Sequence, residues 1–442
     1  MPYLLMGLCC IVIPMNPVIA QDTTQMASLK WDLQTCLDYA KKNNIQLNSL
    51  RLSQKTSEQE LLLSQAGVLP NLYGSATQYA THNNTPAGTS GDYKSRVFGS
   101  GNYGLTSSWT LYQGGYLRSD IQQKNLSVES ANLSILQQEN DITLQITQYY
   151  LNVLLDKETI IYQQNVLSTS KAQVDQANER FKAGSIAKKD VTQLVAQYAN
   201  DKYSLITSEN AQRQDLINLK QLLQVPTSTQ FDIVVPDTIL SKKAIVSLYS
   251  VQQIALANRP EVKNSQLGID IAKVGLNKAK SGYQPTLTAS GFIGSSYAGS
   301  TPGYFTQLSN GFNQQVGLSL SVPIFTKRLN KTNVAEAKIN IDQAQLTLKD
   351  TKTALSLNIE KAYINVINAQ NQFDAAEEAF KSNQETYRVA NEQIKLGVSN
   401  MVEFLQQKTL YIQALQQYIQ AKYNAALTIE IYDFYKGEPV KL

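Results

Sequence analysis

The chain has 442 residues, and its 39 basic and 35 acidic side chains give a formal net charge of +4. This balance is too mild to indicate a nucleic-acid partner. Three cysteines and a single histidine, His82, leave too few side chains for a Cys/His metal site or for histidine-based catalysis. We therefore expect no cofactor, no bound metal and no enzymatic activity.

Residues 1–20 are expected to be a secretory signal. The stretch Tyr3–Ile19 is almost wholly apolar and leads into a small-residue cleavage pattern, although no Lys or Arg precedes it. A mis-assigned start is one alternative, and a lipoprotein signal at the first two cysteines is another. A membrane anchor is disfavoured by Pro14, Pro17 and the short length. Cleavage would leave Cys36 as the only cysteine, which excludes an intramolecular disulfide.

A first β-hairpin is predicted for residues 70–111, after a helix over 31–65. The stretches Leu61–Gly91 and Val97–Leu117 contain no Asp, Glu, Lys or Arg. In the second stretch apolar residues alternate with small or polar ones, which indicates a strand with two unlike faces. Its apolar positions are Tyr103, Leu105, Trp109 and Leu111. The Thr-, Asn- and Gly-rich segment 81–91 is expected to be the connecting loop.

A second β-hairpin is predicted for residues 285–324, after a helix over 251–280. It lies in Ser281–Thr326, a run of 326 − 281 + 1 = 46 residues without a charge. Two alternating segments flank an expected loop at 298–311. Strands of about ten residues with one apolar face are typical of a transmembrane β-barrel. A soluble two-faced sheet is the alternative, but it has no reason to avoid charge over so long a stretch.

Two long helical hairpins are predicted for residues 114–225 and 327–436. The stretches Tyr116–Val225 and Ile324–Lys436 contain no proline and one glycine each, Gly184 and Gly397, and these lie 397 − 184 = 213 residues apart. A lone glycine in a helical run is a C-cap and turn signal. The helix before each glycine is about 65 residues long, or about 100 Å. Apolar residues seven apart favour coiled-coil packing in the second hairpin; they are Ile341, Leu348, Leu355 and Ala362.

The order helix, two strands, long helical hairpin therefore occurs twice. We interpret residues 21–229 and 230–442 as two repeats of a tandem duplication, joined by an irregular linker near residues 225–235. Four strands cannot close a barrel, and a strand edge in a membrane must be paired. Two copies of the chain would supply eight strands and three copies twelve. The helices would extend such a barrel as a hollow tube, which conducts solutes.

The chain resembles the TolC family of outer-membrane efflux channels over nearly all of its length. The matching segments are WDLQTCLDYAKKNN near the start, Leu69-Pro70 and Gln284-Pro285 before the strands, WTLYQGG and VPIF after them, and the tips FKAGSIAKKDV and IKLGVSNMVEF. The resemblance implies a mainly α-helical fold with a small membrane β part, in which four strands of each protomer contribute to a trimeric twelve-stranded barrel. It also implies a location in the outer membrane, and docking on a periplasmic membrane-fusion adaptor that serves an inner-membrane pump of RND or ABC type.

The same resemblance assigns roles to residues at the two tips. The adaptor-docking residues it implies are Phe181, Gly184, Ile394 and Gly397. The residues it implies at the periplasmic entrance are Asp190 and Glu403, each followed one turn later by a glutamine, Gln193 or Gln406. Asp190 and Glu403 have an alternative interpretation, as ordinary acids that stabilise helix N-termini.

The tips also depart from the family pattern. Gln406 stands where the pattern has a second acid, and Ile394 and Ser399 stand where it has the aromatic residue and the Arg that close the entrance. We therefore expect a less acidic and differently latched entrance. The main rival function is a periplasmic coiled-coil adaptor or scaffold. Adaptors also carry compact lipoyl-like and barrel domains, for which the sequence shows no segment.

Overall fold

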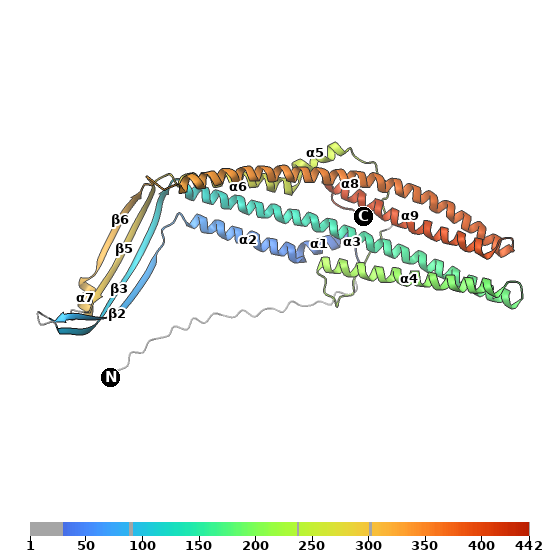
Figure 1. The fold of residues 1–442 in the computed structure, drawn as a ribbon, viewed down its shortest axis with the longest axis horizontal. Helices are drawn as coiled ribbons and strands as arrows, with labels where there is room; N and C mark the ends of the chain where they lie inside the picture. The colour runs from blue at the N-terminus through green and yellow to red at the C-terminus, as the bar shows by residue number, and fades with distance from the viewer. Residues whose placement is uncertain (1–29, 88–91, 237, 300–302, 442) are drawn as a thin grey trace, which may run out of the picture.

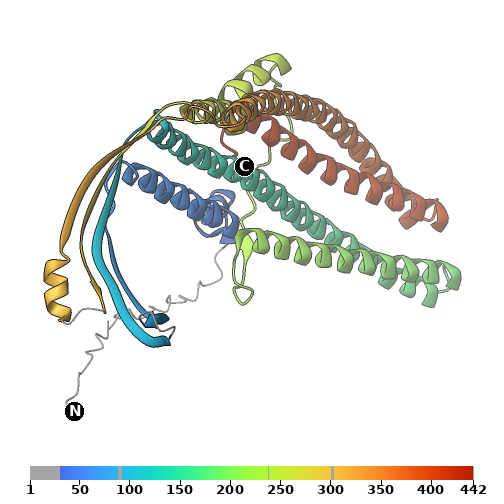
Figure 2. The same cartoon turned by 60° about the vertical axis from the view of Figure 1, so that its left-hand side comes forward.

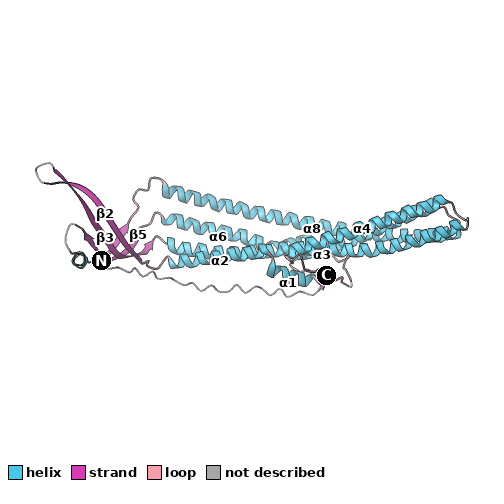
Figure 3. Ribbon diagram, turned by 90° about the horizontal axis from the view of Figure 1, so that it is seen from below, coloured by secondary structure: helices cyan, strands magenta, loops and turns pink. Residues whose placement is uncertain are grey.

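The computed structural model describes residues 30–87, 92–236, 238–299 and 303–441. An elongated helical bundle carries a curved β-sheet at one end (Figure 1; Figure 3). The expected signal at residues 1–20 lies outside the described residues. Within the described ranges, no helix combines the length and the apolar character needed to cross a membrane.

The sheet has four antiparallel strands in the order β2-β3-β5-β6 and bends away from the bundle (Figure 2). The strands are β2 (Tyr73–Ala87), β3 (Asp92–Gln113), β5 (Thr286–Ala298) and β6 (Asn313–Ser321). The loop expected at 81–91 is wrong in part, because β2 stays paired with β3 as far as Ala87. Its Thr- and Asn-rich composition hides a strand, since Thr is a good strand former. The loop expected at 298–311 contains a short helix, α7 (Tyr304–Asn310).

The strand register gathers Tyr103, Leu105 and Trp109 on one face of the sheet, but the register shifts between Thr110 and Tyr112, so that Tyr112 and not Leu111 lies opposite Leu287. Leu105 of β3 lies opposite Ile293 of β5, and Ala289 of β5 lies opposite Leu318 of β6. Because side chains alternate along a strand, residues an even number apart share this apolar face. The other, polar face carries the uncharged side chains of Asn102, Thr106, Thr288, Ser290, Gln315 and Ser319.

Each half of the helical bundle pairs one long helix with shorter helices arranged end to end. The long helices are α3 (Tyr116–Lys182) and α8 (Leu329–Leu396), and the returning helices are α4 (Lys188–Leu223) and α9 (Met401–Lys436). The remaining helices are α1 (Leu33–Asn43), α2 (Ile45–Ala66), α5 (Leu248–Asn258) and α6 (Pro260–Ser281). Near the sheet, α2, α3, α6 and α8 pack in that order. Farther away, α4 packs on α3 and α9 packs on α8.

The single helices expected at 31–65 and 251–280 are each broken in two. At the first break, the Asn44 side chain caps α2 by accepting from the backbone N–H of Leu47, and its Nδ2 donates to the carbonyl of Leu222 at the end of α4 (3.1 Å). At the second, Arg259 precedes Pro260, and its guanidinium lies 4.9 Å from the ring centroid of Phe434 near the end of α9. Each break therefore lies where a returning helix ends.

Left-handed backbone recurs at equivalent places in the two halves. Three pairs of residues with positive φ are each separated by 213 positions, and they are Gly114 (58°) with Lys327 (50°), Gly184 with Gly397 (both 75°), and Gln224 (61°) with Gly437 (94°). Lys327 and Gln224 adopt a conformation that favours glycine. The helix boundaries are thus set by the architecture at these points and not by residue type alone.

The main core lies where the chain start meets the segment between the halves. β1 (Lys30–Trp31) pairs in parallel with β4 (Asp232–Ile233), and the Tyr150 hydroxyl of α3 donates to the carbonyl of Val234 (2.7 Å). Ile233 and Tyr150 are almost fully buried there. A second core holds α8 against α5 and α9, and it includes Leu355 and Ala362 of the predicted seven-residue pattern.

Candidate functional site at the helical tips

Two tight turns close the helical hairpins at the end of the molecule farthest from the sheet (Figure 1). Gly184 separates α3 from α4, Gly397 separates α8 from α9, and both have a φ of 75°. In the first turn the N–H of Ser185 donates to the carbonyl of Arg180 (2.9 Å), and an equivalent bond closes the second turn. This six-to-one bond defines a Schellman C-cap, which needs a left-handed residue and hence favours glycine.

The two tips pack against each other within one protomer. A small apolar cluster joins them, formed by the buried Ala177, Leu194, Ala390 and Phe404. The Arg180 guanidinium of α3 also donates to the carbonyl of Ile394 on α8 (3.3 Å). A cavity of about 290 Å³ lies between the turns and is lined by both hairpins. The tips are therefore one structural unit, although they lie more than 200 residues apart in the sequence.

The predicted docking residues differ in how they reach the surface. The Phe181 side chain is 43% exposed, whereas Ile394 is half-buried and packs on the cluster between the tips. A Cβ placed on Gly184 or Gly397 would meet no atom within 4 Å. Beyond the second turn Val398 is 74% exposed. The surface at the tips thus consists of Phe181, the two glycines and their exposed neighbours. Ile394 packs beneath this surface, on the apolar cluster between the tips.

The two predicted entrance acids have different environments. Asp190, in the first turn of α4, is half-buried and lines the cavity between the tips. Glu403 is exposed, its N–H donates to Asn400 Oδ1 (2.8 Å), and its carboxylate accepts from the Ser399 hydroxyl (3.0 Å). These bonds resemble a capping box. Glu403 therefore stabilises the start of α9, as the alternative interpretation expects, and its carboxylate also faces solvent.

The glutamines one turn later add no charge to the tips. Gln406 is exposed on α9, whereas Gln193 is half-buried on α4. Among the described residues, Gln193 Oε1 is buried without a hydrogen-bond partner. The two hairpins of one protomer thus present one acid each at these predicted entrance positions, Asp190 and Glu403.

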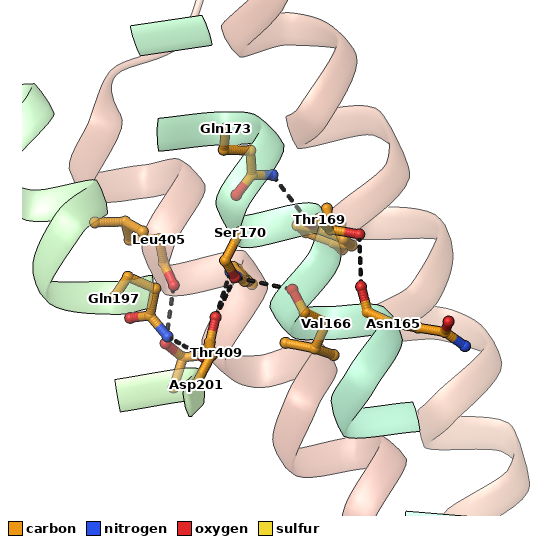
Figure 4. Close-up of polar contacts among 11 residues, drawn as sticks. Asn165, Val166, Thr169, Ser170, Gln173, Gln197, Asp201, Leu405 and Thr409 are labelled. Atoms are coloured by element: carbon orange, nitrogen blue, oxygen red, sulfur yellow. Dashed lines mark hydrogen bonds and ion pairs between the residues drawn. The ribbon is translucent and has the colours of Figure 1, made fainter. Parts of the chain in front are cut away.

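A buried ionic cluster farther from the turns was not predicted from the sequence. Lys408 of α9 is 2% exposed, and its Nζ lies 2.9 Å from Asp201 Oδ2 of α4. The Ser170 hydroxyl of α3 donates to the same carboxylate and accepts from Lys408, and Gln197 donates to Asp201 Oδ1 (2.8 Å). Figure 4 shows Ser170 and Asp201 facing each other at this site. One cluster therefore joins helices of both hairpins.

A second, less buried bridge repeats this connection nearer the main core. Lys422 and the Tyr423 hydroxyl, both on α9, lie 2.8 and 2.7 Å from Glu158 Oε2 on α3. Burial and the neighbouring Glu158 raise the pKa of Tyr423. The two bridges place cations of the second hairpin on acids of the first, so they oppose separation of the hairpins.

The sequence did carry a signal for the buried cluster. Lys408 lies four residues after the buried Phe404 and seven before the buried Leu415, which places it on the apolar stripe of α9. Asp201 lies seven residues after the buried Leu194 of α4. A charge on an apolar stripe requires a partner, because an unpaired buried charge is costly.

Asp156 of α3 is expected to make stability depend on pH. Burial, and to a smaller extent the neighbouring Asp215, raise the pKa of Asp156 to about 7, and Asp156 Oδ2 has no hydrogen-bond partner in the described chain. A raised pKa means that this group's stabilisation is complete below pH about 4 and is lost as the pH rises through 7. Asp156→Asn should therefore stabilise the protein by about 2 kcal/mol at pH 8.

The measurement is thermal unfolding of the detergent-extracted protein at pH 4 and pH 8, followed by the helical circular dichroism signal. The gain from Asp156→Asn should disappear at pH 4, where the native carboxyl is protonated. Asp175→Asn, at an exposed position of the same helix, is the control and should have little effect at either pH. An equal gain at both pH values would contradict ionisation as the cause.

The chain was compared with known protein families, with curated proteins and with solved structures. The model described as outer membrane efflux protein matches residues 36–224 and 251–430. The outer membrane protein TolC of Escherichia coli K12 is 25% identical over 317 residues, which cover 69% of this chain and 62% of that protein. The outer membrane efflux protein BepC of Brucella suis is 21% identical over 419 residues, covering 91% and 85%. The chain thus spans less than two thirds of the length of the E. coli relative.

Solved structures share the whole architecture. The structure of the transmembrane channel protein CusC aligns with a TM-score of 0.79 at 15% identity, covering 95% of this chain and 96% of that one. The Campylobacter jejuni CmeC outer membrane channel aligns with a TM-score of 0.75 at 19% identity, covering 92% and 86%. At these identities the likeness concerns the fold alone.

Proposed function

The chain belongs to the outer membrane efflux protein family, and we propose that it is the outer-membrane exit duct of a tripartite efflux or secretion system. In this role it is a passive channel that receives substrates from a periplasmic adaptor and an inner-membrane pump of RND or ABC type. The family consists of channels and not of enzymes, and the protein is located in the outer membrane.

The two-faced sheet is the observation that carries this proposal. Its apolar face suits lipid, and its polar face bears uncharged side chains suited to a water-filled lumen. In the four-stranded sheet, β2 and β6 are the edges, and an edge within a membrane has to be paired. Three protomers would pair these edges in a closed barrel of twelve strands. The same assembly would close the helical walls into a tunnel that extends into the periplasm.

The duplicated helical hairpins support the partner assignment. We propose that residues 21–229 and 230–442 are two repeats that each present one tip to the periplasm, with Gly184 and Gly397 at the turns. Phe181 and the exposed turn residues would then contact the adaptor. The adaptor or scaffold alternative is not favoured, because a soluble scaffold has no use for an exposed apolar sheet face.

Cation selectivity at the tips tests the entrance assignment. In a trimer, three copies of Glu403 would form an acidic ring, so Glu403→Gln should lower the preference for cations. The measurement is the reversal potential in planar bilayers under a salt gradient. Glu392→Gln is the matched control, because Glu392 is exposed on α8 near the same tip and pairs with Lys395. An unchanged reversal potential for Glu403→Gln would remove this residue from the entrance.

A further inference from the structure

The short helix α7 lies between β5 and β6 at the end of the sheet farthest from the bundle (Figure 1; Figure 2). Two contacts fix it against β5, because the Ser295 hydroxyl donates to the carbonyl of Leu308 and the N–H of Ala298 donates to Gln307 Oε1 (2.9 Å). The helix is thus held on the sheet and does not hang free in a loop.

Aromatic contacts show which face of the sheet α7 adjoins. The Tyr304 ring lies 4.7 Å from the ring of Tyr297, and its hydroxyl lies 3.3 Å from that of Tyr103. In the strand register, Tyr103 and Tyr297 share a face with Leu105 and Ile293. Helix α7 therefore packs beside the apolar face, away from the proposed lumen.

The position of α7 along the strands matches the edge of a membrane. Leu287, near the start of β5, and Tyr297 are 297 − 287 = 10 residues apart on the apolar face, or about 34 Å along the strand. With a strand tilt of about 40°, this span corresponds to about 25 Å across the bilayer, which is the height of the apolar band in outer-membrane barrels. Tyr297 and the adjoining Tyr304 would then lie at the outer headgroup level, where Tyr is preferred.

We propose that α7 is a lipid-contacting helix at the outer-leaflet interface, with Phe305 inserted among the lipids beside the barrel. This inference rests on the proposed transmembrane sheet and extends it to a segment outside the strands. Phe305 is 83% exposed, and its ring contacts the protomer edge-on at the neighbouring Tyr304, with 5.3 Å between the ring centroids. No charged residue lies between Ser281 and Thr326. Helix α7 therefore carries no charge that would oppose its insertion into the lipid. On the same face of β5, Ile293 is followed by Ser295, which bonds to Leu308 of α7, and by Tyr297, which packs on Tyr304.

The test uses tryptophan fluorescence in the full-length protein, reconstituted in vesicles of phosphatidylcholine brominated near the top of the acyl chains. Phe305→Trp is placed in a Trp109→Phe background, because Trp109 lies on the apolar face and would itself be quenched. Trp31, buried in the main core, remains as an internal reference. Tyr79→Trp is the matched control, because Tyr79 pairs with Ser100 and so lies level with Ala298 on the polar face.

Brominated lipid should reduce the emission added by Phe305→Trp to about half or less, and should leave that added by Tyr79→Trp almost unchanged. Equal, weak quenching of both variants would overturn the proposal and would mean that α7 contacts a neighbouring protomer or the lumen. Trp109 of the unmodified protein separates this failure from a failure of the channel assignment. If Trp109 is quenched and Phe305→Trp is not, the membrane sheet stands and only the role of α7 falls.

Discussion

Lys408→Met is expected to destabilise the helical bundle by about 3–5 kcal/mol, because it leaves a buried carboxylate without its cation. The Asp201 side chain is 5% exposed, so water cannot replace the lost ammonium. Ser170 and Gln197 would still donate to it, but neither supplies a charge. Unfolding of the extracted protein in guanidinium chloride, followed by circular dichroism, measures the loss.

Two further variants distinguish lost ionic pairing from lost packing. Lys395→Met removes an exposed cation that pairs with Glu392 within one helix turn, and it should cost less than about 0.5 kcal/mol. Lys408→Met combined with Asp201→Leu removes both charges and should recover most of the stability. If Lys408→Met alone is as stable as Lys395→Met, the cluster does not hold the two hairpins together.

Gly397→Leu, and equally Gly184→Leu, is expected to abolish export while the oligomer stays intact. A leucine at a φ of 75° costs about 1–2 kcal/mol locally, but its Cβ meets no atom within 4 Å. The fold therefore survives, and the new side chain projects from the surface at which we propose that the adaptor docks. Resistance of cells that depend on this channel for drug export measures the effect, and the oligomer is checked on native gels.

The control is Gly268→Leu. A Cβ on Gly268 also meets open space, but this glycine lies within α6, in the part of the bundle near the sheet. Gly268→Leu should leave export at the level of the unmodified protein. Full resistance in cells carrying Gly184→Leu and Gly397→Leu would contradict a docking role for the tips.

Local signals in the sequence were enough to predict the main architecture. The two lone glycines located the turns, because the left-handed residue that ends each long helix is glycine, and glycine can be recognised at a single position of the sequence. Alternation in segments such as 286–293 located strands, because side chains on a strand alternate between faces. The helix break at Arg259 also had a local signal in the sequence, since proline favours the first position of a helix and Pro260 begins α6.

Features that depend on contacts between distant parts of the chain could not be predicted from the sequence in the same way. Lys408 and Asp201 are 207 residues apart, so nothing local pairs them, although each falls on an apolar stripe. The break at Asn44 depends on the meeting of α2 with the end of α4, as its bond to Leu222 shows. The left-handed conformation of Lys327 follows from its place in the architecture, because its residue type predicts the opposite.

The mass of the species extracted from outer membranes in mild detergent, with and without boiling, tests the central claim most directly. We expect three copies of the chain, stable in detergent and separated by heat, because the edges β2 and β6 have to pair between protomers. A monomer in the soluble periplasmic fraction would contradict the channel. It would mean that the sheet does not span the membrane, and the scaffold function would then be the better account.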